Sequence, residues 1–164
     1  MQLKKYIFNC FLLLIPLFLW NIILVGYLPK AYSPELFWKD IPNWIGYGEN
    51  ILRTSVFVFP VIMILSLKTR LQKIGLGIYV IGILIYFSSW LFAIIYPQSA
   101  WTTSLVGFMA PAYTTIIFFV GIGLIGNETF FKISKASLIY IVLSVLFVIF
   151  HSAHTYIVFQ NLNG

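Results

Sequence analysis

Charged residues are scarce in this sequence of 164 residues: they make up 9% of it, and only four residues are acidic. Soluble domains are about one quarter charged, so this composition excludes an ordinary soluble globular domain. A disordered chain is excluded as well, because such chains have low hydrophobicity, whereas 61% of these residues are hydrophobic and the mean hydropathy is +0.98. The composition therefore indicates an integral membrane protein.

Cysteine is nearly absent, since Cys10 is the single one. An internal disulfide and the exchange chemistry of paired cysteines are therefore excluded. The place of Cys10 early in an apolar segment is typical of a small buried hydrophobic residue. No catalytic, nucleotide-binding or metal-binding motif is recognisable. The basic residues form no continuous stripe, so we expect no nucleic-acid partner.

Long apolar segments dominate what is present, and their continuity favours helices over the alternating strands of a barrel. We predict an all-α integral membrane protein in which residues 1–164 form a single transmembrane domain. Its fold would be a bundle of five transmembrane helices. The first apolar run is too long for the core of a signal peptide, so we expect it to be a retained span. The predicted spans cover about residues 6–28, 51–67, 74–96, 105–125 and 136–159.

The basic residues predict the orientation in the membrane, because cytoplasmic loops are enriched in Lys and Arg. With five spans, seven basic residues fall on one side of the membrane, and Lys30 and Lys39 fall on the other. We therefore expect a cytoplasmic N-terminus, a C-terminus outside and a location in the plasma (inner) membrane. The seven are Lys4, Lys5, Lys68, Arg70, Lys73, Lys132 and Lys135.

The longest predicted loop, about residues 29–50, would lie outside and carry a short amphipathic segment. Ser33 is suited to cap a short helix that has Pro34 at its first position. Aromatic residues follow, and rings with a polar tip are typical of the headgroup region. We interpret the segment either as an interfacial anchor or as a lid over a pocket, with Trp38 and Trp44 as the lid residues.

Ionisable residues inside a span cost about 2.5–3.5 kcal/mol each, so those present are the strongest functional signal. Glu49 and Arg53 are four residues apart, which places them on one face of a helix in the favourable order. They either neutralise each other at the interface or belong to a pocket. His151 and His154, three residues apart near the end of the last span, also share a face.

The start of the second predicted span and the end of the fifth lie on the same side of the membrane. We therefore predict one outward-facing aromatic and polar pocket. His151 and His154 could also bind a metal ion with Glu49 as a third ligand, because a catalytic zinc site usually has three protein ligands. The predicted ligand-binding residues are Glu49, Asn50, Arg53, Trp90, Trp101, His151 and His154.

Other polar and small residues inside the spans indicate packing. Pro16, Pro60 and Pro111 are expected to kink their helices. Glycines at Gly75, Gly82 and Gly121 favour close approach between helices, and Asn21 is expected to form a hydrogen bond across helices.

The leading functional hypothesis is a binding or accessory membrane protein without catalysis of its own. It would hold a lipid or small apolar molecule, or pack against a membrane partner subunit or a second copy. One alternative is an intramembrane enzyme or metal-binding protein that uses His151, His154 and Glu49. Another is an oligomeric channel or transporter, although no span carries a polar stripe through its full depth. The sequence identifies no cofactor.

Overall fold

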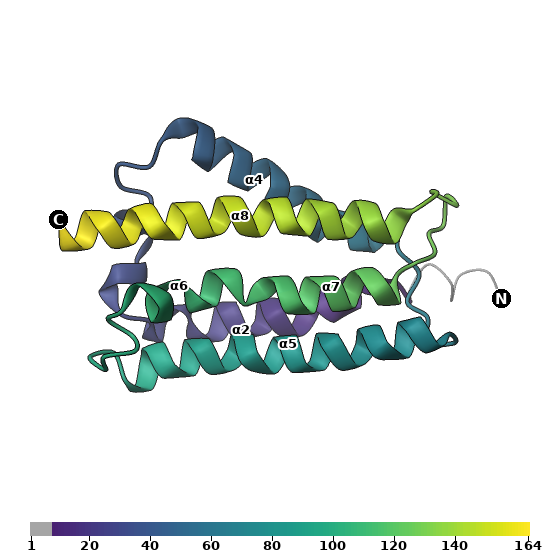
Figure 1. The fold of residues 1–164 in the computed structure, drawn as a ribbon, viewed down its shortest axis with the longest axis horizontal. Helices are drawn as coiled ribbons and strands as arrows, with labels where there is room; N and C mark the ends of the chain where they lie inside the picture. Colours follow the sequence, from purple (N-terminus) through teal and green to yellow (C-terminus); the bar gives the residue numbers. More distant parts are fainter. Residues whose placement is uncertain (1–7) are drawn as a thin grey trace.

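The computed structural model describes residues 8–164, and these form a bundle of helices without a β-strand (Figure 1). Lys4, Lys5 and the start of the first predicted span lie outside the described residues. Four helical segments are long and apolar enough to cross a membrane: Cys10–Tyr27, Arg70–Ile95, Leu105–Ile125 and Ala136–Asn163. The chain is therefore an all-α protein with the character of a membrane protein, as predicted.

The first of these segments is a composite of a 3-10 helix η1 (Cys10–Leu14), an α-helix α2 (Ile15–Leu24) and a second 3-10 helix η2 (Val25–Tyr27). Within the described residues it begins at Cys10, and the side chain of Asn9 caps it by accepting a hydrogen bond from the backbone N–H of Phe11. An Asn at this position satisfies a backbone donor that the helix leaves unpaired.

The next apolar helix, α5 (Arg70–Ile95), begins four residues before the predicted residue 74. A capping box explains the early start, since Thr69 accepts from the backbone of Gln72 and the Gln72 side chain accepts from the backbone of Thr69.

The fourth predicted span has the predicted bounds but is divided into α6 (Leu105–Tyr113) and α7 (Thr115–Ile125). The interruption follows Pro111, which cannot donate a helix hydrogen bond. The last helix, α8 (Ala136–Asn163), extends a few residues beyond the predicted end at residue 159.

The predicted second span, residues 51–67, is wrong in its bounds. The helix α4 runs over Asn43–Val58, and a 3-10 turn η4 (Phe59–Val61) follows it. Pro60 explains the end, because its ring has no N–H and crowds the preceding turn. The predicted start was too late because the polar residues Glu49, Asn50 and Arg53 interrupt the apolar pattern of the helix. The connection before α4 is therefore shorter than the predicted loop 29–50. It contains η3 (Lys30–Tyr32) and α3 (Pro34–Phe37), which is the short helix expected after Ser33.

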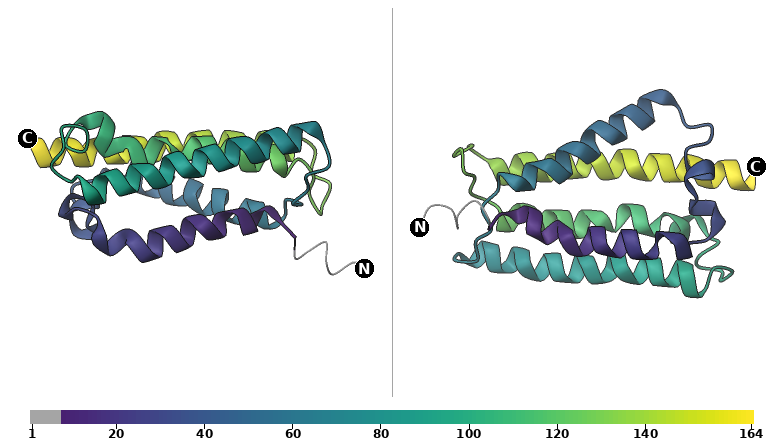
Figure 2. Two further views of the ribbon diagram at one scale, coloured as in Figure 1. Left: turned by 90° about the horizontal axis from the view of Figure 1, so that it is seen from below. Right: turned by 180° about the vertical axis from the view of Figure 1, so that it is seen from behind.

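The connecting segments gather at two ends of the bundle (Figures 1 and 2). At one end, which we call the Phe37 end, residues 28–42 lie beside the last turns of α8, and the connection 96–104 lies at the same end of the bundle. There the side chain of Asn161 donates to the carbonyl of Lys39 over 3.5 Å, and Tyr32 Oη donates to the carbonyl of Phe108 over 3.0 Å.

At the opposite end, which we call the Gln72 end, residues 62–72 meet residues 126–130. Gln72 Nε2 donates to Asn127 Oδ1 over 2.9 Å, and isolated backbone bridges join Met63 to Thr129 and Asn9 to Ile64. The helix α4 thus leads from the Phe37 end back to the Gln72 end.

The glycines of α5 and α7 let these two helices pack very closely. A Cβ atom at Gly82 would lie 2.4 Å from the backbone nitrogen of Phe118, and one at Gly121 would lie 2.5 Å from that of Tyr79. Real Cβ atoms do not approach backbone so closely, so only glycine fits at either position. The prediction that these glycines serve helix packing is confirmed.

Candidate functional site

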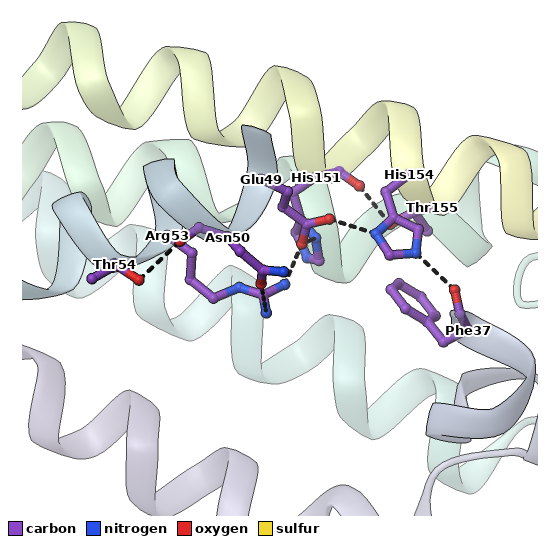
Figure 3. Close-up of polar contacts among 8 residues, drawn as sticks. All are labelled: Phe37, Glu49, Asn50, Arg53, Thr54, His151, His154 and Thr155. Carbon is purple, nitrogen blue, oxygen red and sulfur yellow. Dashed lines mark hydrogen bonds and ion pairs between the residues drawn. The ribbon is translucent and has the colours of Figure 1, made fainter. Parts of the chain in front are cut away.

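The most unusual feature of the bundle is a carboxylate with no exposed surface between α4 and α8. Glu49 is 0% exposed, and three side chains surround its two oxygens (Figure 3). Arg53 Nη2 and His151 Nδ1 contact Oε1, the latter over 2.9 Å, and His154 Nδ1 lies 2.5 Å from Oε2. We call Glu49, Arg53, His151 and His154 the Glu49 cluster. A buried charge requires such partners, because burial without them is very costly.

The local sequence explains how the cluster is assembled. Glu49 and Arg53 share one face of α4 because they are one helical turn apart, and His151 and His154 share one face of α8. Gly48 lets α4 approach α8, since a Cβ atom there would lie 2.3 Å from the ring of Phe150. The predicted meeting of these two helices at their polar residues is present in the structure.

His154 is held on both ring nitrogens. Its Nε2 donates to the backbone carbonyl of Phe37 over 2.7 Å, while its Nδ1 faces Glu49. The side chain is 0% exposed, and the rings of Phe37 and Trp38 pack against it with centroid distances of 4.5 and 4.7 Å. His154 therefore fastens the connection 28–42 to α4 and α8.

His151 takes a more accessible position beside the same carboxylate. Its side chain is 21% exposed, and its ring stacks on Phe147 at 5.4 Å and 7° between the planes. Thr155 donates to the backbone carbonyl of His151 over 2.8 Å. Both His151 and Arg53, which is 32% exposed, line a cavity next to the cluster.

This cavity has a volume of about 410 Å³ and lies within the bundle, with residues from α2, α4, α5, α6, α7 and α8 around it. Most of its lining is apolar or aromatic, including Leu17, Phe57, Phe118 and Phe119. The polar side chains come from several elements: Asn21, Tyr32, Arg53, Tyr86, Thr115, His151 and Thr155. Small-molecule sites are of this kind, with apolar walls and a few convergent polar groups, and range from about 300 to 1,000 Å³.

The residues predicted from the sequence take different places around this cavity. Arg53, Trp90 and His151 line it. Glu49 and His154 lie behind Arg53 and His151, and Asn50 accepts a hydrogen bond from Arg53 Nη1 over 3.3 Å. Trp101 does not line the cavity and is half exposed in the turn before α6.

The predicted lid residues also lie outside the cavity lining. Trp38 covers His154, while Trp44 is 67% exposed and touches the edge of Phe150. At the Phe37 end the cavity is instead lined by Tyr32 and Phe37. The ring of Tyr32 stacks on Phe108 at 4.7 Å, and burial raises the pKa of its hydroxyl.

The metal hypothesis gains no support from the geometry. Among residues 8–164, no group of three or more His, Cys, Asp or Glu side chains could hold a metal ion. The Nδ1 atoms of both histidines already face the carboxylate of Glu49. Glu35, in the connection 28–42, is exposed, and hydrogen bonds from its own backbone N–H and from Ser33 lower its pKa. Metal binding by His151 and His154 stays a prediction.

Several contributors to the site were not predicted. The carbonyl of Phe37 belongs to the backbone, so no residue type in the sequence could indicate its role. Tyr86 Oη donates to Asn21 Oδ1 over 2.8 Å on the cavity wall, and Trp20 stacks on Phe87 at 3.9 Å and 9°. These contacts attach α2 to α5 beside the cavity, and the expected cross-helix hydrogen bond of Asn21 is confirmed.

The cluster can supply cationic hydrogen-bond donors to whatever occupies the cavity. Arg53 carries a permanent charge on a planar group with five N–H donors, and Glu49 fixes the orientation of both Arg53 and His151.

No family model, no curated protein and no solved structure matches this chain.

Proposed function

We propose that this chain is a plasma-membrane protein with five membrane-crossing segments, and that α4 with η4 is the fifth. The course of the chain supports this proposal, since α4 leads from the Phe37 end to the Gln72 end (Figure 2). The basic residues support a cytoplasmic N-terminus, because Lys68, Arg70 and Lys73 belong to the Gln72 end while Lys30 and Lys39 belong to the Phe37 end.

A reporter fused after Gly164 tests this topology. Five crossings place the C-terminus opposite to the N-terminus, so a reporter that is active only outside the cytoplasm is expected. Activity in the cytoplasm would contradict the five-span arrangement and favour four spans.

The proposed activity is binding of a lipid or small apolar molecule, without catalysis. The observation that carries it is the cavity of about 410 Å³, whose mainly apolar wall is interrupted by a few polar groups, Arg53 among them. A site of this form buries an apolar body and orients it by a polar end. Its entrance would be near the outer leaflet, because Tyr32 and Phe37 belong to the outer connection in the proposed topology.

Native mass spectrometry of the purified protein with single-chain amphiphiles, both charged and uncharged, tests the binding. Saturable binding is expected at one site per chain. Ala112 lines the cavity and is 2% exposed, so Ala112→Leu should reduce the affinity by occupying part of the space. Ala100→Leu is the matched control, because Ala100 is exposed in the turn before α6.

Two results would contradict this function. One is the absence of saturable binding of any amphiphile to the wild-type protein. The other is an Ala112→Leu variant that binds as well as the Ala100→Leu control.

A further inference from the structure

The Glu49 cluster has a net charge that can be counted from its hydrogen bonds. The carbonyl of Phe37 can only accept, so Nε2 of His154 must carry a hydrogen. A hydrogen bond between His154 Nδ1 and Glu49 Oε2 requires one further proton, because an imidazole nitrogen without a hydrogen and a carboxylate oxygen both only accept. If that proton is on His154, an imidazolium faces a carboxylate; if it is on Glu49, both groups are neutral. The pair of Glu49 and His154 therefore sums to zero in either case.

Arg53 then remains without a compensating negative charge. Its contact with Glu49 does not change the sum, because the single negative charge of Glu49 is already balanced by the proton shared with His154. His151 is either neutral or positive, so the cluster carries a charge of at least +1. Within residues 8–164, every ion pair belongs to Glu49, and no second carboxylate pairs with the cluster.

This excess charge faces the cavity, because Arg53 and His151 are the cluster members that line it. The remaining wall is mostly apolar, and a net positive charge beside it is costly wherever water does not reach that charge. An anion at this wall would remove that cost. The guanidinium of Arg53 is well suited to an oxyanion, because its parallel N–H groups match carboxylate and phosphate oxygens.

We infer that the ligand of the cavity is an amphiphile with a single-chain apolar body and a monoanionic oxyanion head, which Arg53 binds at the wall that it shares with His151. This inference rests on the proposed binding function and adds the charge and the position of the head. A single chain is favoured over two because the cavity is near the lower limit of small-molecule sites. The apolar body would lie among Phe57, Phe118 and Phe119.

The test compares dodecanoate with its uncharged relatives 1-dodecanol and methyl dodecanoate on the full-length protein in neutral detergent or phosphatidylcholine nanodiscs. Wild-type protein should bind dodecanoate at least about tenfold more tightly than either neutral compound, since charge-assisted hydrogen bonds to Arg are strong. Arg53→Gln should lower the affinity for dodecanoate while leaving that for 1-dodecanol nearly unchanged.

Arg70→Gln is the matched control, because it removes the same charge at the start of α5, at the Gln72 end and away from the cavity. It should keep the wild-type preference for the carboxylate. Arg53→Lys is the second variant in case Arg53→Gln does not fold; it keeps the charge but loses the planar group, so an intermediate preference is expected.

The possible outcomes separate this inference from the proposed function. Equal affinity of the wild-type protein for dodecanoate and 1-dodecanol would overturn the anionic head but leave the apolar binding function standing. An Arg53→Gln variant that keeps the full preference would also overturn the inference. No binding of any of the three compounds would overturn both.

A single-chain lysophospholipid and a free fatty acid could both supply the oxyanion. Adding lysophosphatidylglycerol to the nanodiscs distinguishes them. If it displaces bound dodecanoate, the head bound at Arg53 is a lipid phosphate; if it does not, the ligand is a free carboxylate. Either result supports an anionic ligand.

Discussion

Replacing Glu49 by Gln tests whether the buried carboxylate holds α4 against α8. The substitution keeps the size of the side chain and exchanges one acceptor oxygen for an amide group that donates. Glu49 faces donors from three side chains and is 0% exposed. A glutamine can accept from Arg53 and His151 through its oxygen and donate from its N–H₂ group to Nδ1 of a neutral His154, but it removes the negative charge that these side chains face.

The expected loss in the free energy of unfolding is about 3 kcal/mol. Hydrogen bonds to charged groups contribute about 1.5–3 kcal/mol each, and breaking a buried pair costs about 3–5 kcal/mol. The contribution of Arg53 is smaller than that of His154, because Arg53 is 32% exposed and water can replace part of the contact. Exchange of the charge-assisted bond to the fully buried His154 for a neutral one therefore accounts for most of the expected loss.

The assay is reversible unfolding in mixed micelles followed by tryptophan fluorescence. Glu128→Gln is the matched control, since Glu128 is exposed, and it should leave stability unchanged. The double variant Glu49→Gln with Arg53→Gln should lose less than the sum of the two single losses, because it removes the unpaired guanidinium as well. A loss below about 1 kcal/mol for Glu49→Gln, the value of an exposed ion pair, would refute this account of the cluster.

Two further substitutions test the packing around the cavity. Gly82→Ala should lower the free energy of unfolding by about 1–3 kcal/mol, because the added methyl group would overpack against the backbone of Phe118. The control is Gly77→Ala, where α5 faces open space, and it should be neutral or stabilising by up to about 1 kcal/mol. Equal effects of the two substitutions would contradict the close contact of α5 with α7. Tyr86→Phe should lower the free energy of unfolding by about 1 kcal/mol, because the hydrogen bond to Asn21 disappears. The control is Tyr96→Phe, since the side chain of Tyr96 is 57% exposed. A Tyr86→Phe variant as stable as that control would show that the bond does not hold α2 in place.

The long apolar helices were predictable because the bilayer imposes both their length and their composition. The segments near residues 74–96, 105–125 and 136–159 correspond to α5, to α6 with α7, and to α8. Single residues with a strong local meaning were predictable too. Asn21 forms the expected cross-helix bond, and Gly82 and Gly121 have the expected close contacts.

Other features depend on three-dimensional contacts that residue types do not encode. The sequence predicted the meeting of Glu49 with His151 and His154, because topology places the two helix ends together. It did not predict that the carbonyl of Phe37 fixes the hydrogen on His154, because every residue has such a carbonyl. The lining of the cavity was missed for a similar reason, since Phe57 and Phe119 resemble the other apolar residues of their helices.

The predicted start of α4 was too late because of the same polar residues that form the candidate site. Its sequence differs from the other long helices because Glu49, Asn50 and Arg53 interrupt the apolar pattern. Each charged side chain costs about 2.5–3.5 kcal/mol in a span, so α4 is a poor membrane segment by itself. Within the bundle that cost is offset by the histidines of α8, which supply hydrogen bonds to the carboxylate. The stability of α4 in the bundle therefore depends on α8, and the positive charge left over at Arg53 faces the cavity of the bundle.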